Sequence, residues 1–300
     1  MSQTTEANRP VKRSEVSKLR WTWQEMKNNK TAYFMLAPFF LLFIIFTILP
    51  VLLSMILSLT DFNMLQMPHF LGISNFIRLF LEDDIFLLAC QNTLIFAAIT
   101  GPVSYLLSLL IAWFINELPP KIRSVVTLIF YAPSISGQVY LIWKTLFSSD
   151  SYGWANATLM KLGIIETEIN WFRDETYVMP LCIVVSLWTS LGTSFLSNIA
   201  GLQGVDRSLY EAGAIDGVHN RFQEIWYLTL PQMKPQLLFG AVMQISSSFA
   251  CGGVMATLCG NPSVDYATHT IINHISDYGG ERYELGYACA ISTVLLMVML

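Results

Sequence analysis

Charged residues are scarce in this chain of 300 residues: Asp, Glu, Lys and Arg make up 13% of it, whereas apolar residues make up 54%. A soluble domain usually carries about 25% charged residues, so this chain has too little charge to cover a water-soluble globule of its size. Intrinsic disorder is excluded because disordered chains are polar and highly charged. The formal net charge of −4 argues against nucleic acid as a partner, since basic residues supply most of that affinity.

Metal-binding and catalytic patterns are also missing. The five cysteines are an odd number without a C-x-x-C pair, which is typical of small buried side chains and not of a redox or zinc set. The four histidines show no metal spacing; His269 and His274 are five residues apart and would fall on different faces of a helix. We therefore expect no cofactor, no metal site and no catalytic constellation.

Long apolar runs dominate what is present. A helix needs about 20 apolar residues to cross a bilayer, and only helices satisfy their own backbone groups in lipid. The sequence predicts an all-α, polytopic membrane protein whose transmembrane domain covers residues 31–300. Its six predicted transmembrane helices lie near 33–59, 93–115, 125–147, 177–202, 237–258 and 285–300. The sixth run is only about 24 Å long at ~1.5 Å per residue, so we expect further residues to follow it.

Lys and Arg lie mainly on one side of these runs. Seven lie in the tail 1–30, two follow the second run and three follow the fourth, against four in the other loops. The positive-inside rule then places both termini in the cytoplasm. The tail is too long and too charged for a signal peptide and is predicted to lie as a helix on the inner membrane surface. The acidic outer loops fit either a solvated face or a docking surface for an external partner.

The cytoplasmic loop 204–233 is the most informative segment. Ser208 followed by Glu211 is a capping-box pattern that predicts the start of a short helix, and Gly217 can take the left-handed conformation that stops it. Asn220 is the N-cap signal of a second helix, which Pro231 is predicted to end. Apolar faces on such helices need a partner, either the chain's own spans or another protein.

At this loop the sequence resembles a known family. Glu211-Ala212-Gly213, three residues, Gly217 and then Leu228-Thr229-Leu230-Pro231 is similar to the E-A-A-x3-G-x9-I-x-L-P loop of ABC importer permeases. Gly213 replaces the usual Ala, Leu228 replaces Ile, and the spacing between Gly217 and Leu228 is one residue longer. Further matches to the oligosaccharide branch of these permeases are Pro50 with Ser58–Asn63, Gly72–Phe76, Asn92–Leu94 and Gly286–Ala288.

The resemblance implies the type I ABC importer fold and a set of partners. The chain would be a permease subunit in the plasma membrane, surrounded by lipid. It would pair with a second homologous permease, a dimer of ATP-binding cassette ATPases and an extracytoplasmic solute-binding protein that delivers an oligosaccharide. No G-x-x-x-x-G-K-[ST] occurs, so we expect ATP hydrolysis on a separate subunit and no enzyme activity here.

The resemblance also implies which residues couple transport to the ATPase. Glu211 would be the charged anchor on the ATPase; the alternative is that it serves only as the third residue of its own helix cap. Gly217 would allow the sharp turn between the two helices. The predicted coupling residues are Glu211, Ala212, Gly213, Asp216, Gly217, Leu228 and Pro231.

Polar side chains in the fourth and fifth runs are candidates for the substrate pathway, since sugars need hydroxyl and amide partners and aromatic faces. The alternative is that small polar residues simply pack helices together in the membrane. Gln and Asn cost more to bury without a partner. The predicted pathway residues are Trp188, Ser190, Thr193, Asn198, Gln244, Ser247 and Ser248.

Two other functions remain open. An ion-coupled secondary transporter or channel subunit would need buried acidic residues in the spans, and the runs contain none. A membrane scaffold without transport would not need an ATPase at the loop. The ligand of an importer could also be a peptide or a polyol, and the second permease could be identical to this one.

Overall fold

The computed structural model describes residues 29–137 and 139–300. The predicted basic tail, 1–30, therefore lies almost entirely outside the described residues. The chain divides into two compact units, residues 1–54 and 55–300. Within the described ranges the secondary structure is helical, apart from one isolated bridge between Thr60 and Phe70.

The first apolar run forms one continuous helix over Lys30–Leu57. It consists of α2 (Lys30–Phe43), a π-helical stretch η1 (Ile44–Ile48) and α3 (Leu49–Leu57), of which the last residues belong to the second unit. At ~1.5 Å per residue this helix is about 42 Å long, which is enough to cross a bilayer.

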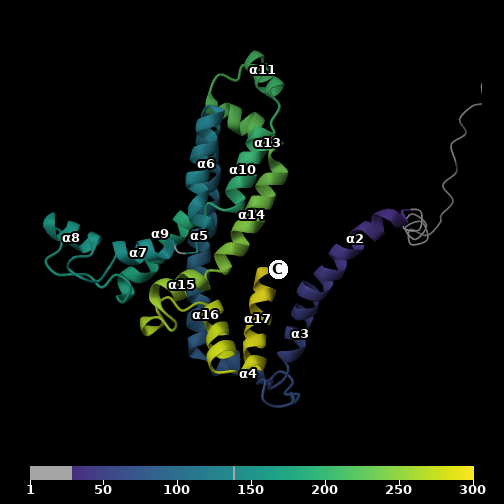
Figure 1. The fold of residues 1–300 in the computed structure, drawn as a ribbon, viewed down its shortest axis with the longest axis vertical. Coiled ribbons are helices and arrows are strands. Elements are labelled where there is room, and N and C mark those ends of the chain that lie inside the picture. The colour runs from purple at the N-terminus through teal and green to yellow at the C-terminus, as the bar shows by residue number, and fades with distance from the viewer. Residues whose placement is uncertain (1–28, 138) are drawn as a thin grey trace, which may run out of the picture. The chain divides into compact units, whose positions relative to one another are not determined.

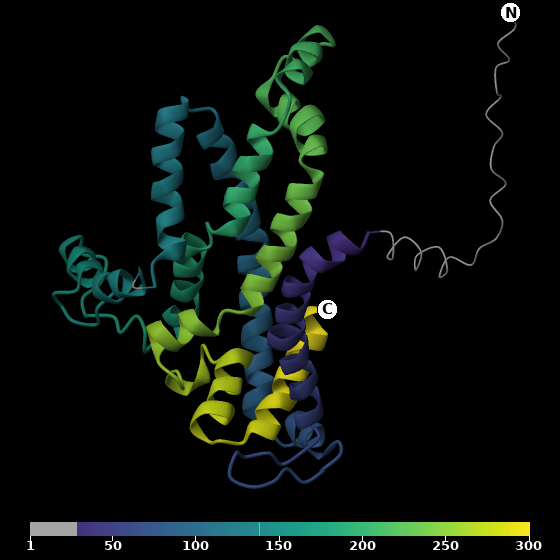
Figure 2. The same cartoon turned by 45° about the vertical axis from the view of Figure 1, so that its right-hand side comes forward.

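Three helices form the centre of the second unit: α5 (Asp84–Asn116), α10 (Thr193–Gln203) and α14 (Lys234–Phe249) lie side by side (Figures 1 and 2). Small residues bring them together. A Cβ on Gly240 of α14 would lie 2.9 Å from Ser194 Oγ of α10, so larger side chains would push these helices apart. This is the packing expected of helices in membranes.

The two ends of α5 carry different elements. At its N-terminal end gather α4 (Ser74–Leu81), α16 (Ile271–Ser276), the π-turn η4 (Asp277–Glu281) and α17 (Leu285–Met299). At its C-terminal end lies α11 (Arg207–Ile215), at the opposite end of the unit in Figure 1. The flank of the unit is formed by α6 (Pro120–Ile135), α7 (Val139–Leu146), α8 (Trp154–Lys161), α9 (Glu175–Thr189), α15 (Gly252–Cys259) and the 3₁₀ turn η3 (Val264–Tyr266).

All six predicted runs are helical, but two of their descriptions were wrong. The second helix begins at Asp84 and not near 93, because the Asp83 carboxylate caps it by accepting from Phe86 N. The third run is not one continuous helix: α6 and α7 differ in direction by 83°, at a break that follows Pro133 and contains Gly137. The fifth run is bent by 41° between α14 and α15.

Length and composition then give three helical segments able to cross a membrane within the described ranges, 30–57, 84–116 and 175–203, or five if each bent pair counts as one. The sixth, α17, has 15 residues and is shorter than the ~20 that a bilayer requires. This agrees with the short run that the sequence showed there.

Candidate functional site

The first loop helix, α11, begins two residues earlier than the sequence predicted. Asp206, and not Ser208, is its N-cap: the Asp206 carboxylate accepts from Ser208 N at 3.0 Å. This hydrogen bond and a second one from the Ser208 side chain lower the pKa of Asp206. The capping box of Ser208 and Glu211 is therefore absent, and Glu211 has no role in capping its own helix.

The turn between the two loop helices is confirmed. Gly217 has φ +92°, a conformation that favours glycine, and Val218 N donates to Gly213 O at 2.9 Å, which is the Schellman pattern at a helix end. Asn220 then caps the second helix by accepting from Phe222 N at 3.0 Å.

The second loop helix does not end at Pro231. It runs through α12 (Arg221–Gln223), the π-helical stretch η2 (Glu224–Thr229) and α13 (Leu230–Gln232). A π-turn closes its hydrogen bonds over one more residue than an α-turn. It therefore accommodates the one extra residue between Gly217 and Leu228, and Pro231 follows this widened turn without breaking the helix.

The two loop helices are packed into one element. A Cβ on Gly213 would lie 2.6 Å from Leu228 Cδ1, so the glycine makes room for the longer leucine. The two departures from the usual loop pattern thus fit each other. Tyr210 Oη and Thr229 Oγ1 add a hydrogen bond of 2.9 Å between the helices.

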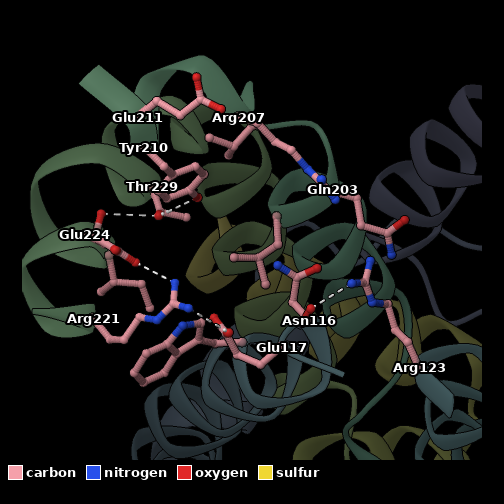
Figure 3. Close-up of a pocket in the computed structure, with 14 residues that line it drawn as sticks. Asn116, Glu117, Arg123, Gln203, Arg207, Tyr210, Glu211, Arg221, Glu224 and Thr229 are labelled. Carbon is pink, nitrogen blue, oxygen red and sulfur yellow. Dashed lines mark hydrogen bonds and ion pairs between the residues drawn. The ribbon is translucent and has the colours of Figure 1, made fainter. Parts of the chain in front are cut away.

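A polar pocket of about 580 Å³ connects this element to the end of α5 (Figure 3). Arg221 lies between two carboxylates, with Nη1 2.8 Å from Glu224 and Nη2 3.6 Å from Glu117 at the end of α5. The hydrogen bond to Glu224 and the two negative charges raise the pKa of Arg221. On the other side, Arg123 Nη2 donates to Asn116 O at 2.8 Å. These contacts connect the loop mechanically to the end of α5.

Part of the loop surface is uncovered. Glu211 also lines this pocket, but it is exposed, lies apart from the Arg221 group in Figure 3, and has no ion pair or side-chain hydrogen bond among the described residues. Ala212, Asp216 and Pro231 are exposed as well. Three large apolar side chains are also open to solvent: Ile215 is 87% exposed, Phe222 69% and Trp226 67%. Large exposed apolar side chains on one element are typical of a protein interface.

A second cavity, of about 220 Å³, lies between α5, α7, α9, α14 and α15. Four predicted pathway residues line it: Ser190, Gln244, Ser247 and Ser248. Helix α5 also lines the cavity, with Thr100 and Ser104, and the sequence interpretation missed these two residues. Their small polar side chains, one helical turn apart in an apolar run, could have indicated that they face a cavity. Thr100 is sixteen residues from either end of α5, so the cavity lies halfway along it.

Free hydrogen-bonding groups face this cavity. Gln244 is only 5% exposed, and its side-chain amide makes no hydrogen bond within the described ranges. Ser186 Oγ also lines the cavity and is buried without a partner. Leaving such groups unpaired costs about 1–3 kcal/mol each, so the cavity is suited to a ligand that supplies hydroxyl groups.

The other three predicted pathway residues lie elsewhere. Asn198 is fully buried and donates to Ser108 Oγ at 3.1 Å, which joins α10 to α5 as helix packing. Thr193 is exposed. Trp188 packs edge-on against Trp143 with ring centroids 5.5 Å apart. None of the three lines the cavity.

A buried polar cluster at the N-terminal end of α5 was not predicted. Asp83 Oδ2 accepts from Tyr287 Oη at 2.7 Å and lies 3.0 Å from His274 Nε2. His274 Nδ1 in turn lies 3.1 Å from His269 Nε2. The two histidines meet because His269 precedes the cap of α16, Thr270, and is not on the helix; the expectation of different helix faces was wrong for this reason. We call Asp83, His269, His274 and Tyr287 the Asp83 cluster.

The comparisons with known proteins agree with this architecture. Residues 30–300 match the family described as "Binding-protein-dependent transport system inner membrane component". The arabinooligosaccharides transport system permease protein AraP of Bacillus subtilis (strain 168) is 30% identical over 282 residues, which cover 93% of this chain and 88% of AraP. The lactose transport system permease protein LacF of Rhizobium radiobacter is 35% identical over 211 residues, covering 69% and 68%.

A solved structure shares the fold. It is a bacterial alginate ABC transporter in complex with an alginate pentasaccharide-bound periplasmic protein, and one of its chains superposes with a TM-score of 0.73 at 25% identity, over 92% of this chain and 94% of that one. A family match over nearly the whole chain, two curated relatives and this superposition all point the same way. The chain belongs to the family of inner-membrane components of binding-protein-dependent transport systems, and its fold is that of an ABC importer permease.

Proposed function

We propose that this permease forms the membrane pathway for an oligosaccharide, and that residues 204–233 couple the pathway to a separate ATPase. The observation that carries the proposal is the arrangement along α5. A cavity with unpaired polar groups lies at its midpoint, and a stiff two-helix element with an uncovered surface is fastened to its C-terminal end. The names of AraP, LacF and the alginate transporter support sugar as the ligand class.

The assembly follows from the family. The chain works with a second permease, a dimer of ATP-binding cassette ATPases and an extracytoplasmic binding protein, and ATP is hydrolysed on the ATPase. The loop 204–233 and both termini lie in the cytoplasm, with the basic tail 1–30 on the inner surface and residues 31–300 as the transmembrane domain. The Asp83 cluster then lies at the extracytoplasmic end. An ion-coupled mechanism is not favoured, because within the described ranges no Asp or Glu is buried along a helix that could span the membrane, and the buried Asp83 carboxylate only caps the end of α5.

In the coupling step, closure of the ATPase dimer on ATP moves the loop as a rigid body. Glu211 and the exposed apolar side chains contact the ATPase, while Gly213, Gly217, Leu228 and Tyr210 hold the two loop helices together. The Arg221 ion pairs and the packing of α14 on α5 pass the movement to the helices that line the cavity. The cavity then changes the side to which it opens.

Reversing one charge on the loop tests the coupling role. Glu211→Lys should lower the amount of ATPase that co-purifies with the permease several-fold, because it reverses the charge at the proposed contact with the ATPase. The Glu211 carboxylate is exposed and has no partner within the permease, so the change should not disturb the fold. The permease itself should unfold at an unchanged temperature. Glu281→Lys, the same change on an exposed residue of η4, should co-purify normally. Normal co-purification and normal ATP hydrolysis with Glu211→Lys would contradict the assignment.

The pathway role is tested at Gln244. Gln244→Leu keeps the volume and removes the amide, so each lost hydrogen bond of about 1 kcal/mol should lower uptake about fivefold in vesicles that contain the assembled complex and its binding protein. Labelled arabino-oligosaccharide and lactose, the ligands named for two relatives, are the probes. Gln236→Leu is the control, since Gln236 is on the same helix but does not line the cavity. Equal uptake by both variants would exclude Gln244 from the pathway.

A further inference from the structure

Two cysteines far apart in the sequence lie in contact. Cys182 on α9 and Cys259 at the end of α15 have their sulfur atoms 3.4 Å apart. The sequence pattern gave no sign of this pair, since 77 residues separate them. Both belong to one apolar cluster with Phe96 and Met255.

The two thiols differ in access. Cys182 is fully buried. Cys259 is only partly buried and lines a pocket of about 440 Å³ together with Lys144 and Arg173. A reagent in this pocket can therefore reach the Cys259 thiol first, and Cys182 can react only with its neighbour.

The geometry allows a bond after a small movement. A disulfide has its sulfur atoms about 2.05 Å apart, so the pair must approach by about 1.4 Å from its 3.4 Å contact. Cys259 is the last residue of α15, and the chain leaves the helix at Gly260. Cys259 can therefore shift without breaking the hydrogen bonds of a helix interior.

We propose that Cys182 and Cys259 form a reversible disulfide that links α9 to α15 when the permease meets a small disulfide oxidant such as oxidised glutathione. This rests on the proposed function for the orientation, which opens the Cys259 pocket to the extracytoplasmic side, where disulfides persist. Within the described residues no other pair of cysteines has its sulfur atoms within hydrogen-bonding distance, although Cys251 belongs to the same apolar cluster.

The exchange balances without any other reactant. The Cys259 thiolate attacks one sulfur of the oxidant, forms a mixed disulfide and releases one thiolate. The Cys182 thiolate then attacks the Cys259 sulfur, forms the internal bond and releases the second thiolate. The protons of the two cysteines end on the two released thiols, and the oxidant is reduced by the two electrons that the pair loses.

The bond would act on the transport cavity. Helix α9 contributes Ser186 and Thr189 to the cavity wall, and α15 contributes Val254. A covalent link between these helices fixes part of that wall in one arrangement. Oxidation should then slow the alternation of the pathway, and reduction should restore it.

Mass spectrometry of the purified complex tests the bond. After treatment with oxidised glutathione, the permease should lose the mass of two hydrogen atoms, and digestion should yield one cross-linked pair of peptides containing Cys182 and Cys259. The pair should persist in Cys251→Ser, a buried cysteine of the same cluster, and disappear in Cys259→Ser and Cys182→Ser. If both thiols remain open to alkylation after denaturation, or Cys259 keeps glutathione without closing the bridge, the proposal is wrong.

ATP hydrolysis stimulated by the binding protein tests the consequence. The oxidised wild-type complex should hydrolyse ATP several-fold more slowly and recover with dithiothreitol, whereas the Cys259→Ser complex should not respond to the oxidant. A bridged complex with unchanged hydrolysis would overturn the effect on transport. Failure of the importer assignment is a different result, because the reduced wild-type complex would then show no stimulation at all.

Discussion

Replacing Gly286 by alanine should destabilise the permease by about 3 kcal/mol, at the upper end of the cost of overpacking. Gly286 lies in the first turn of α17, and its N–H donates to Phe62 O at 2.9 Å. A Cβ at this position would overlap with Thr60 O and lie 3.0 Å from Phe62 N. These are backbone atoms, so no side-chain rotation can relieve the overlap, and α17 would have to move away from the 60–62 turn.

Gly253→Ala is the matched control for this prediction. Gly253 is also near the start of a helix, α15, but a Cβ there would meet nothing within 4 Å. Alanine should stabilise that helix by up to about 1 kcal/mol, because glycine is a poor helix former. Thermal unfolding in detergent measures both variants. The packing at Gly286 is refuted if Gly286→Ala unfolds at the wild-type temperature.

The sequence alone was sufficient for features that depend on local composition. Apolar runs identified every long helix, because lipid leaves no other backbone structure available. Gly217 and Asn220 were recognised because their roles in a turn and a cap follow from their own chemistry. The break after Pro133 could have been predicted as well, since Pro133, Ser136 and Gly137 lie close together in an otherwise apolar run.

Features that depend on partners far away in the sequence could not be predicted from the sequence alone. The start of α5 was placed too late because Gln91 and Asn92 look unsuited to a membrane helix. The side-chain amide of Asn92 donates hydrogen bonds to the carbonyl oxygens of Tyr266 and His269, almost 180 residues away. The partner of Asn198 could not be predicted either, because Ser108 Oγ, which accepts from its amide, lies 90 residues away.

The choice between Ser208 and Asp206 as N-cap shows a different limit. Both residue types are strong N-caps, and they are two positions apart. The S-x-x-E pattern favoured Ser208, but the hydrogen bond is made by Asp206. The consequence is functional, because it leaves the Glu211 carboxylate free of its own helix.

The Asp83 cluster should weaken as the pH falls from about 6.5 to about 4. Burial, and then the neighbouring His274, lower the pKa of His269 from 6.5 to about 4. The negative charges of Asp277 and Asp83 raise the pKa of His269, and the positive charge of Arg282 lowers it further. His269 is 1% exposed, so its environment in the closed cluster differs strongly from water.

The hydrogen bonds explain why protonation is unfavourable. The Asp83 carboxylate can only accept, so His274 donates its Nε2–H to it; in the neutral tautomer that this bond selects, His274 Nδ1 accepts from His269 Nε2–H. His269 Nδ1 is then a bare nitrogen, and it is buried without a partner among the described residues. A proton added there would be a buried charged donor with no acceptor, which is costly. The rings of Tyr266 and Tyr278, next to His269 and His274, offer no acceptor in place of water.

Asp83 keeps its charge through most of this pH range. Burial alone would raise the pKa of the Asp83 carboxyl, but hydrogen bonds from Tyr287, Phe86 N and His274 outweigh it and lower the pKa. Its stabilising contribution is therefore present above the ordinary value of 3.8 and is lost only in stronger acid. Asp83 therefore does not account for the change expected between pH 6.5 and pH 4.

The sign and size follow from linkage. An opened segment binds a proton at His269 with a pKa near 6.5, and the closed cluster does so only near 4, so the closed form is fully favoured above pH 6.5 and loses its advantage as the pH falls. Each pH unit is worth ~1.4 kcal/mol, which gives a loss of about 3 kcal/mol near pH 4. The protection factors of residues 263–276 in hydrogen exchange, taken relative to the intrinsic exchange rate at each pH, should therefore fall about 100-fold over this range.

Two variants separate this effect from general acid sensitivity. His269→Gln removes the titrating ring and should flatten the pH dependence of these protection factors between pH 6.5 and pH 4. His219→Gln, at an exposed position in the cytoplasmic loop, should retain the wild-type slope. An unchanged slope in His269→Gln would show that another group responds to acid. Because the Asp83 cluster joins the N-cap of α5 to α16 and α17, its opening frees the end of the helix whose middle lines the cavity.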